Sequence, residues 1–114
     1  MSGAIEPGNV VATPGALAAL EQAGKTAPEF INRHLTGDWG DLGRFDLTEV
    51  TEREREYGAM ATSDDGKLNR LAVEANNGSR VMSQYTLESG ERIWISTQGD
   101  GPSRNTCVML PSEY

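Results

Sequence analysis

The sequence has few of the residues on which enzyme and metal sites usually depend. Among 114 residues there is one cysteine, Cys107, and one histidine, His34. A single thiol excludes an internal disulfide framework and a cysteine-based structural zinc site, and it fits a reducing compartment. The short motifs of nucleotide-binding, metalloprotease and serine hydrolase sites are also missing. We therefore expect no enzyme activity, no metal and no cofactor.

Basic charge and long apolar runs are scarce as well. Ten lysines and arginines stand against seventeen acidic residues, a net charge of −7. Because a net negative charge repels the phosphates of nucleic acids, we expect no direct nucleic-acid binding. No run approaches the roughly 18 apolar residues of a membrane span, and the first residues do not resemble a signal peptide. We expect a cytoplasmic protein, whose acidity suits either solubility alone or a protein partner with a basic surface.

The chain is about one domain long, and its first residues differ in composition from the rest. Residues 1–12 contain Gly3, Pro7 and Gly8, which predict a flexible leader. Residues 13–114 then predict a single α+β domain.

Two short helices are predicted at the start of this domain. Thr13 and Pro14 supply an N-cap and a proline at the first helical position, and Gly24 follows as a stop. Thr26 and Glu29 match a capping box that begins the second helix, which ends near residues 36–37. The expected buried positions are Ala16, Leu17, Leu20 and Ala23 in the first helix, and Phe30, Ile31 and Leu35 in the second.

Two further helices are predicted in the middle of the chain. A sparse apolar stripe and a second capping box at residues 51–54 indicate a helix that begins near residue 48 or 52. Leu68, Leu71, Ala72 and Ala75 follow the spacing of one helical face, and Asn77-Gly78 ends that helix.

Alternating and β-branched residues predict three strands in the last third of the chain. The runs are residues 81–87, 92–97 and 106–110. A turn at Ser89-Gly90 and a loop at residues 99–102 join them as an antiparallel meander. Short N-terminal helices packed on this three-stranded sheet make an α+β fold.

Acidic residues gather in one part of the sequence. Residues 38–65 hold nine acids against three arginines. Such a row is usually a solvated face, but it can also imitate DNA phosphates or dock on a basic groove. If it binds a partner, the expected contact residues are Glu49, Glu52, Glu54, Glu56, Tyr57, Asp64 and Asp65.

Trp94 is the strongest single candidate for a contact residue. Strand alternation places Trp94 on the face opposite Ile93 and Ile95, where it is partly exposed if the helices cover the isoleucines. Aromatic side chains dominate interface hot spots. The alternative is a cross-strand aromatic pair with Tyr85.

His34, Asp38 and Asp41 are the residues that an enzyme of this sequence would use, as a small hydrolase or transferase. A histidine in the last turn of a helix also interacts favourably with the terminal carbonyls, which is the structural explanation. The segment from Asp38 to Asp41, which we expect to form a turn, lacks two of the oxygen ligands of a calcium-binding loop. We expect Trp39 to anchor it in the core, with the aspartates capping amides.

Several motifs in order resemble those of an uncharacterised family of small bacterial proteins found on plasmids and prophages. The matching segments are Thr13 to Leu17, Arg33-His34, the Gly-Asp-Trp-Gly-Asp turn at 37–41, Ser83 to Tyr85, Ile93 to Thr97, and Leu110-Pro-Ser-Glu-Tyr114. Relative to the family, residues 43–64 look like an acidic insertion.

The resemblance implies a mobile-element accessory protein that acts by protein–protein binding. Its most concrete form is an inhibitor of a host defence nucleoprotein complex, of the anti-CRISPR or anti-restriction type. The alternative is a regulatory or antitoxin-like homodimer that pairs through an exposed third strand. An enzyme using His34 with Asp38 or Asp41 is the third hypothesis.

Overall fold

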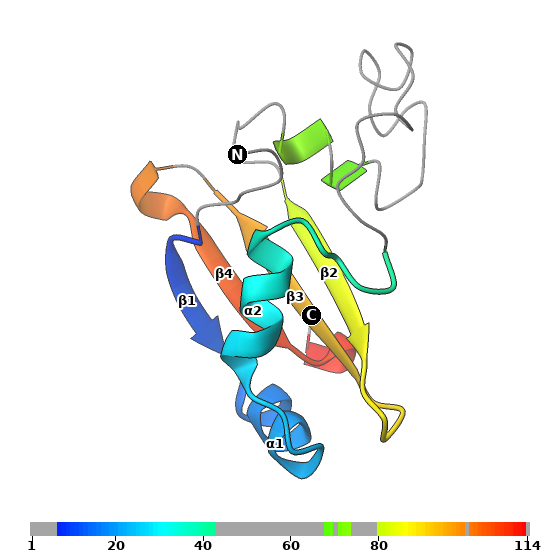
Figure 1. Cartoon of the computed structure of the whole chain (residues 1–114). Helices are drawn as coiled ribbons and strands as arrows, with labels where there is room; N and C mark the ends of the chain where they lie inside the picture. Colours follow the sequence, from blue (N-terminus) through cyan, green and yellow to red (C-terminus); the bar gives the residue numbers. More distant parts are fainter. Residues whose placement is uncertain (1–6, 43–67, 70, 74–79, 100, 114) are drawn as a thin grey trace.

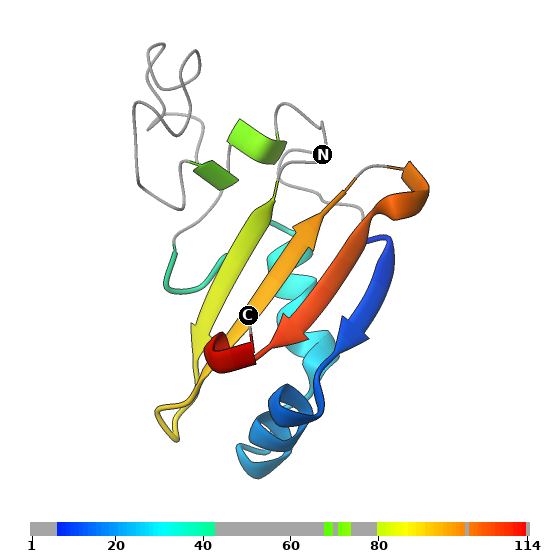
Figure 2. The same cartoon turned by 180° about the vertical axis from the view of Figure 1, so that it is seen from behind.

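The computed structural model describes residues 7–42, 68–69, 71–73, 80–99 and 101–113. They form an α+β fold in which a four-stranded sheet carries α2 across one face (Figure 1). No described α-helix crosses the opposite face of the sheet, where the 3₁₀ turn at Pro111–Glu113 lies against the end of β3 (Figure 2). The elements are β1 (Asn9–Ala12), α1 (Pro14–Gln22), α2 (Ala27–Leu35), β2 (Val81–Thr86), β3 (Arg92–Gln98) and β4 (Asn105–Met109), with 3₁₀ turns at Gly101–Ser103 and Pro111–Glu113.

The predicted meander is present, but the sheet is larger and mixed. Strands β2, β3 and β4 pair antiparallel, and β1 adds to β4 in parallel, giving the order β1-β4-β3-β2. The predicted antiparallel meander of three strands is therefore confirmed, whereas the fourth, parallel strand was not predicted. A parallel partner is not signalled by a hairpin, because it lies far away in the sequence.

Residues 9–12, which the sequence assigns to a leader, form the fourth strand. The Asn9 amide donates to the Arg104 carbonyl at 3.1 Å, and the Thr13 amide donates to the Val108 carbonyl at 2.9 Å. Gly8 adopts φ 64°, and a Cβ there would lie 2.2 Å from the Arg104 oxygen. This glycine therefore permits close packing as the chain enters β1.

The helices begin where the sequence predicts, although one cap and one buried position differ. Thr13 Oγ1 accepts from the Ala16 amide at 3.1 Å and caps α1. Thr26 occupies the N-cap of α2 but makes no side-chain cap bond, so the predicted start of the helix is confirmed and the Thr26 cap bond of the capping box is not. Leu17 is 47% exposed, whereas Leu20 is buried. Only a narrow, small-residue face of α1 packs on the sheet.

The buried side chains form two clusters. The larger one lies between the helices and the sheet and includes Leu20, Phe30, Tyr85, Ile93, Ile95 and Val108. The smaller one joins Trp39, Ala72 and Val81, with Leu42 and Val73 beside them. Trp39 is fully buried, which confirms its predicted anchoring role. Residues 68–69 and 71–73 are helical, and the helix predicted to begin near 48 or 52 lies outside the described residues.

Candidate functional site

The Gly-Asp-Trp-Gly-Asp turn closes the outer edge of β2. The Trp39 carbonyl accepts from the Gln84 amide at 3.2 Å, and the Asp41 amide donates to the Gln84 carbonyl at 2.7 Å. Gly40 adopts φ 64°, and a Cβ there would lie 2.2 Å from the Gln84 oxygen. The turn therefore behaves as a short extra strand, and it needs glycine at this position.

Asn69 closes the next part of the same edge. Its side-chain amide donates to the Met82 carbonyl at 2.5 Å and accepts from the Met82 amide at 2.7 Å. The two chain segments that flank residues 43–67 are thus attached to β2 at Met82 and Gln84, two residues apart. The second hydrophobic cluster holds the same two segments together through Trp39 and Ala72.

Asp38 faces the side of the sheet that α2 covers. Its carboxylate accepts from Arg33 Nε at 2.9 Å and from the Gly40 amide at 3.2 Å. The Arg33 guanidinium lies 4.7 Å from the centre of the Tyr85 ring and 5.7 Å from that of Phe30. The hydrogen bond with Asp38 raises the pKa of Arg33. An arginine is therefore held between a carboxylate and two aromatic rings.

Asp41 belongs to the opposite side of the sheet, together with Trp94. The exposed Asp41 carboxylate accepts from Thr86 Oγ1 at 2.5 Å and from Gln84 Nε2 at 3.2 Å. These two hydrogen bonds, that from Thr86 first, lower the pKa of Asp41. Gln84 Oε1 accepts from the indole nitrogen of Trp94 at 2.9 Å. We refer to Asp41, Gln84, Thr86 and Trp94 as the Trp94 array.

The orientation of Gln84 in this array follows from chemistry. An indole nitrogen only donates and an ionised carboxylate only accepts, so the amide oxygen must face Trp94 and its nitrogen must face Asp41. Trp94 is half-buried on the face opposite Ile93 and Ile95, as its alternation predicts. Its predicted role in binding is carried into the proposal below. The other predicted contact residues, Glu49 to Asp65, lie outside the described residues.

His34 is fully buried and takes part in a chain of side-chain hydroxyls. Its Nδ1 lies 2.6 Å from Ser83 Oγ, and its Nε2 lies 2.9 Å from Thr97 Oγ1. Thr97 Oγ1 lies 2.7 Å from Thr106 Oγ1, which donates to the Pro7 carbonyl at 2.8 Å. The chain therefore runs from β2 through α2, β3 and β4 to the residues that precede β1.

The Pro7 carbonyl sets the direction of every hydrogen bond in this chain. Because a carbonyl only accepts, Thr106 uses its proton there and must accept from Thr97. Thr97 then accepts from His34 Nε2, and His34 Nδ1 accepts from Ser83. His34 is therefore neutral with its proton on Nε2, in agreement with burial, which lowers its pKa to about 4.

Two sequence-based interpretations of His34 are wrong. A neutral ring adds no positive charge at the end of α2, so its role is not electrostatic support of the helix terminus. Its two ring nitrogens bond to Ser83 and Thr97, so the predicted pairing with Asp38 or Asp41 does not form. The signal that sequence reasoning missed is polarity at core-facing strand positions. Ser83 shares its face with Tyr85, Thr97 with Ile95, and Thr106 with Val108.

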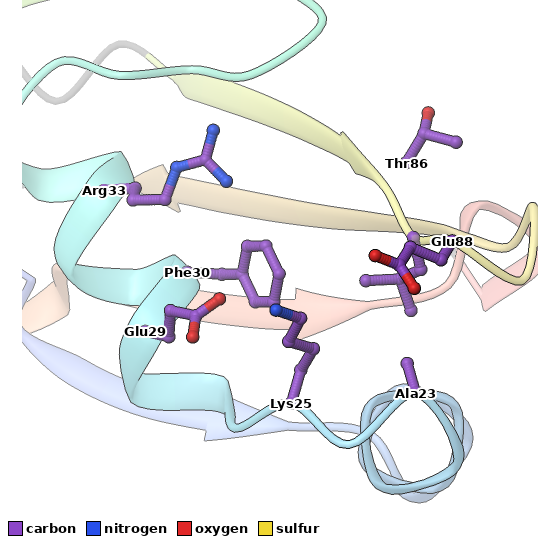
Figure 3. A pocket seen from close by; sticks show the side chains of 8 residues that line it. Ala23, Lys25, Glu29, Phe30, Arg33, Thr86 and Glu88 are labelled. Atoms are coloured by element: carbon purple, nitrogen blue, oxygen red, sulfur yellow. The ribbon is translucent and has the colours of Figure 1, made fainter.

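A small cavity of about 220 Å³ lies beside the start of α2, near the turn after β2 (Figure 3). Its lining mixes two basic and two acidic side chains with apolar ones, and His34 does not line it. The lining residues are Ala23, Lys25, Glu29, Phe30, Arg33, Thr86, Leu87 and Glu88. Phe30 and Leu87 are buried, so the cavity offers little apolar surface to a ligand.

Metal and membrane signals are absent from the described part of the chain. No three His, Cys, Asp or Glu side chains there are grouped so that they could hold a metal ion. None of the helices described is long and apolar enough to cross a membrane. In comparisons with known proteins, no family model, curated protein or solved structure matches the chain.

Proposed function

We propose that this protein acts by binding a protein partner with a basic surface, through the acidic insertion at residues 43–64 and through Trp94. The observation that carries the proposal is the attachment of both flanks of this segment to one edge strand. Asp41 is tied to Gln84, and Asn69 is tied to Met82. Binding residues are often carried on loops that a rigid scaffold positions.

The distribution of charge supports the same proposal. The described residues hold seven acidic and five basic side chains, whereas the whole chain holds seventeen and ten. The scaffold is thus close to charge balance. Most of the excess acid lies in the remaining residues, of which 43–67 are the longest stretch. Acidic charge concentrated in one segment attracts a basic partner and speeds its association.

In its concrete form, the protein is an accessory factor of a mobile element that works in the cytoplasm. It inhibits a host defence nucleoprotein complex, of the anti-CRISPR or anti-restriction type. The carboxylates at Glu52, Glu54 and Glu56 replace nucleic-acid phosphates on the basic groove of that complex. The resemblance to plasmid and prophage proteins supports this form. The proposal assigns no catalytic step to His34, because its ring nitrogens both bond to buried hydroxyls.

Affinity capture from the native host, with the partner identified by mass spectrometry, tests the proposal. Reversal of Glu52, Glu54 and Glu56 to lysine should abolish capture. The matched control reverses Glu21, Glu88 and Glu91, three exposed acids of the scaffold, and changes the net charge equally. The control should retain the partner. Capture that survives the first reversal would contradict an acidic binding surface.

A second candidate, the regulatory or antitoxin-like homodimer, is favoured by one observation. The predicted third strand is β4, which lies between β1 and β3 and has no open edge. Pairing through it is therefore wrong. Among the described strands, β1 is the outermost on the side away from β2, and its Val10 and Val11 are 46% and 55% exposed. A second copy would pair there.

A further inference from the structure

We propose that the cavity beside the start of α2 is a binding site for a small α-amino acid, whose carboxylate pairs with Arg33 and whose ammonium group pairs with Glu29. The cavity has a volume of about 220 Å³ and lies between α2 and the turn that follows β2 (Figure 3). None of its lining residues belongs to the acidic insertion, and Trp94 is not among them. The site therefore goes beyond the proposed function and does not depend on it.

The volume of the cavity limits the size of its ligand. Sites for drug-sized molecules have volumes of about 300–1,000 Å³, so this cavity accepts only a smaller molecule. Phe30 and Leu87 line its inner side, and both are buried. The Phe30 ring packs on Tyr85 with 5.1 Å between the ring centres, which fixes this side of the cavity. Because Phe30 and Leu87 expose little apolar surface, polar groups must supply most of the recognition.

The charges around the cavity select a ligand that carries both signs. Two bases, Lys25 and Arg33, and two acids, Glu29 and Glu88, line it. A simple anion is repelled by the two acids and a simple cation by the two bases, whereas a zwitterion can place each charge beside an opposite one. The side chains of Lys25, Glu29 and Glu88 make no hydrogen bond or ion pair with any other described residue. They are therefore available to a ligand.

Glu29 and Arg33 have the spacing that an α-amino acid requires. They are four residues apart in α2, so their side chains are neighbours on one face of the helix, with about 5–6 Å between their Cβ atoms. Figure 3 shows both side chains extending from α2 toward the cavity. In an α-amino acid the ammonium group and the carboxylate are attached to one carbon, so its opposite charges are also adjacent. One ligand can thus meet both residues at once.

Arg33 is oriented before a ligand arrives. Its Nε–H donates to Asp38 at 2.9 Å, and its guanidinium lies 4.7 Å from the centre of the Tyr85 ring. The four N–H groups of its two terminal nitrogens have no hydrogen-bond partner among the described residues. These N–H groups form the fork that binds a carboxylate at two points. A donor that is already held in place loses little conformational entropy on binding.

The test is a titration of the ¹⁵N-labelled full chain with L-alanine, followed by nuclear magnetic resonance. For so small a ligand we expect a dissociation constant on the order of 1 mM. The Nε–H signal of Arg33 should move and saturate. The amide signal of Cys107 should stay in place, because β4 contributes no residue to the lining.

Two blocked ligands test the requirement for both charges. N-acetyl-L-alanine lacks the ammonium group, and L-alanine amide lacks the carboxylate. Each should bind at least about three-fold more weakly than L-alanine, because one attraction is lost and like charges around the cavity are left unopposed.

Three substitutions of exposed residues make the site specific. Glu29→Gln should weaken binding of L-alanine by about two- to five-fold and strengthen binding of N-acetyl-L-alanine. Lys25→Gln should also weaken binding of L-alanine, but it should strengthen binding of L-alanine amide. Glu91→Gln is the matched control, because Glu91 is an exposed acid of the same hairpin that does not line the cavity. This variant should bind L-alanine as the parent does.

The inference is overturned by an Arg33 signal that does not move or does not saturate, by equal binding of the three ligands, or by equal effects of Glu29→Gln and Glu91→Gln. Failure of this site is distinguishable from failure of the proposed function. Capture of the host partner reports on the acidic insertion through Glu52, Glu54 and Glu56, and none of these residues takes part in the titration.

Discussion

A buried histidine is tolerated when its neutral ring is fully hydrogen-bonded, and this is the situation of His34. Ser83 donates to Nδ1, and Nε2–H donates to Thr97. Protonation would place a second N–H at Nδ1, so the Ser83 hydroxyl could no longer donate its proton to this nitrogen. The charge itself would also lie in the core. The residue is therefore an acid-sensitive point of the fold.

The first prediction concerns stability between pH 6.5 and 4. The pKa of His34 falls from 6.5 to about 4 on folding, so the unfolded chain binds one more proton in this window. Its stabilising contribution is complete above pH 6.5 and is lost as the pH falls, by about 3 kcal/mol at most. Urea unfolding across the window should show this loss. His34→Gln removes the titrating group and should flatten the profile, even if the variant is less stable at pH 7.

Other groups act mainly below pH 5 and leave the upper part of the window, between pH 6.5 and 5, to His34. The pKa values of Asp41 and Glu113 are also lowered, the former chiefly by Thr86 and the latter by Thr13. Their ordinary values are 3.8 and 4.5, so their contributions decline mainly below pH 5. A profile in His34→Gln that is as steep as the parent's between pH 6.5 and 5 would contradict the assignment.

At the scale of elements, the outer edge of β2 is the feature that organises the candidate site. An open strand edge invites pairing with other chains. Here the Gly-Asp-Trp-Gly-Asp turn pairs with Gln84, and Asn69 pairs with Met82. This edge is thus occupied along its middle, and the acidic segment begins and ends there.

The second prediction is that Asn69→Ala loosens this edge. The substitution leaves the buried amide and carbonyl of Met82 without their partners, which costs about 2–3 kcal/mol of unfolding free energy. Denaturant unfolding measures the loss, and hydrogen exchange should show reduced protection at the Met82 amide. Ser89→Ala removes an exposed hydrogen bond to the Glu91 amide and serves as the control, with a change below about 0.5 kcal/mol. Equal stability of the two variants would contradict the role of Asn69.

At the scale of the whole molecule, the two edges of the sheet differ. The β2 edge is covered by the chain itself, whereas β1 is outermost among the described strands. In the parallel ladder with β4, the backbone groups of Val10 and Ala12 point away from the sheet. No charged residue or proline interrupts Asn9–Ala12, so this strand lacks the usual protection against pairing.

The third prediction belongs to the homodimeric candidate. Pairing of two β1 edges should give twice the monomer mass by light scattering at high protein concentration, and Val11→Lys should return the protein to a monomer. Leu17→Lys is the matched control, because Leu17 is 47% exposed on α1 rather than on the strand. The control should leave the dimer intact. A monomer at all concentrations in the parent protein would exclude this candidate.

The sequence by itself determined the elements that depend on neighbours close along the chain. Thr13-Pro14 begins α1 as predicted, the three strands of the meander form, and Trp94 lies opposite Ile93 and Ile95. Caps, proline positions and alternation act over a few residues, so a reader of the sequence can recognise them. The predicted burial of Trp39 belongs here too.

Only the tertiary structure decided the contacts between distant residues. His34 meets Ser83 and Thr97 across 49 and 63 positions, and Thr106 meets Pro7 across 99. Residues Asn9–Ala12 form a strand because they pair with the edge of β4 that faces away from β3. A run of four residues is too short to show a strand pattern in the sequence. Asp38 and Asp41 belong to the same turn, but their side chains lie on opposite faces of the sheet. Asp38 pairs with Arg33, whereas Asp41 belongs to the Trp94 array. Which distant polar groups meet is a property of packing, and no local pattern encodes it.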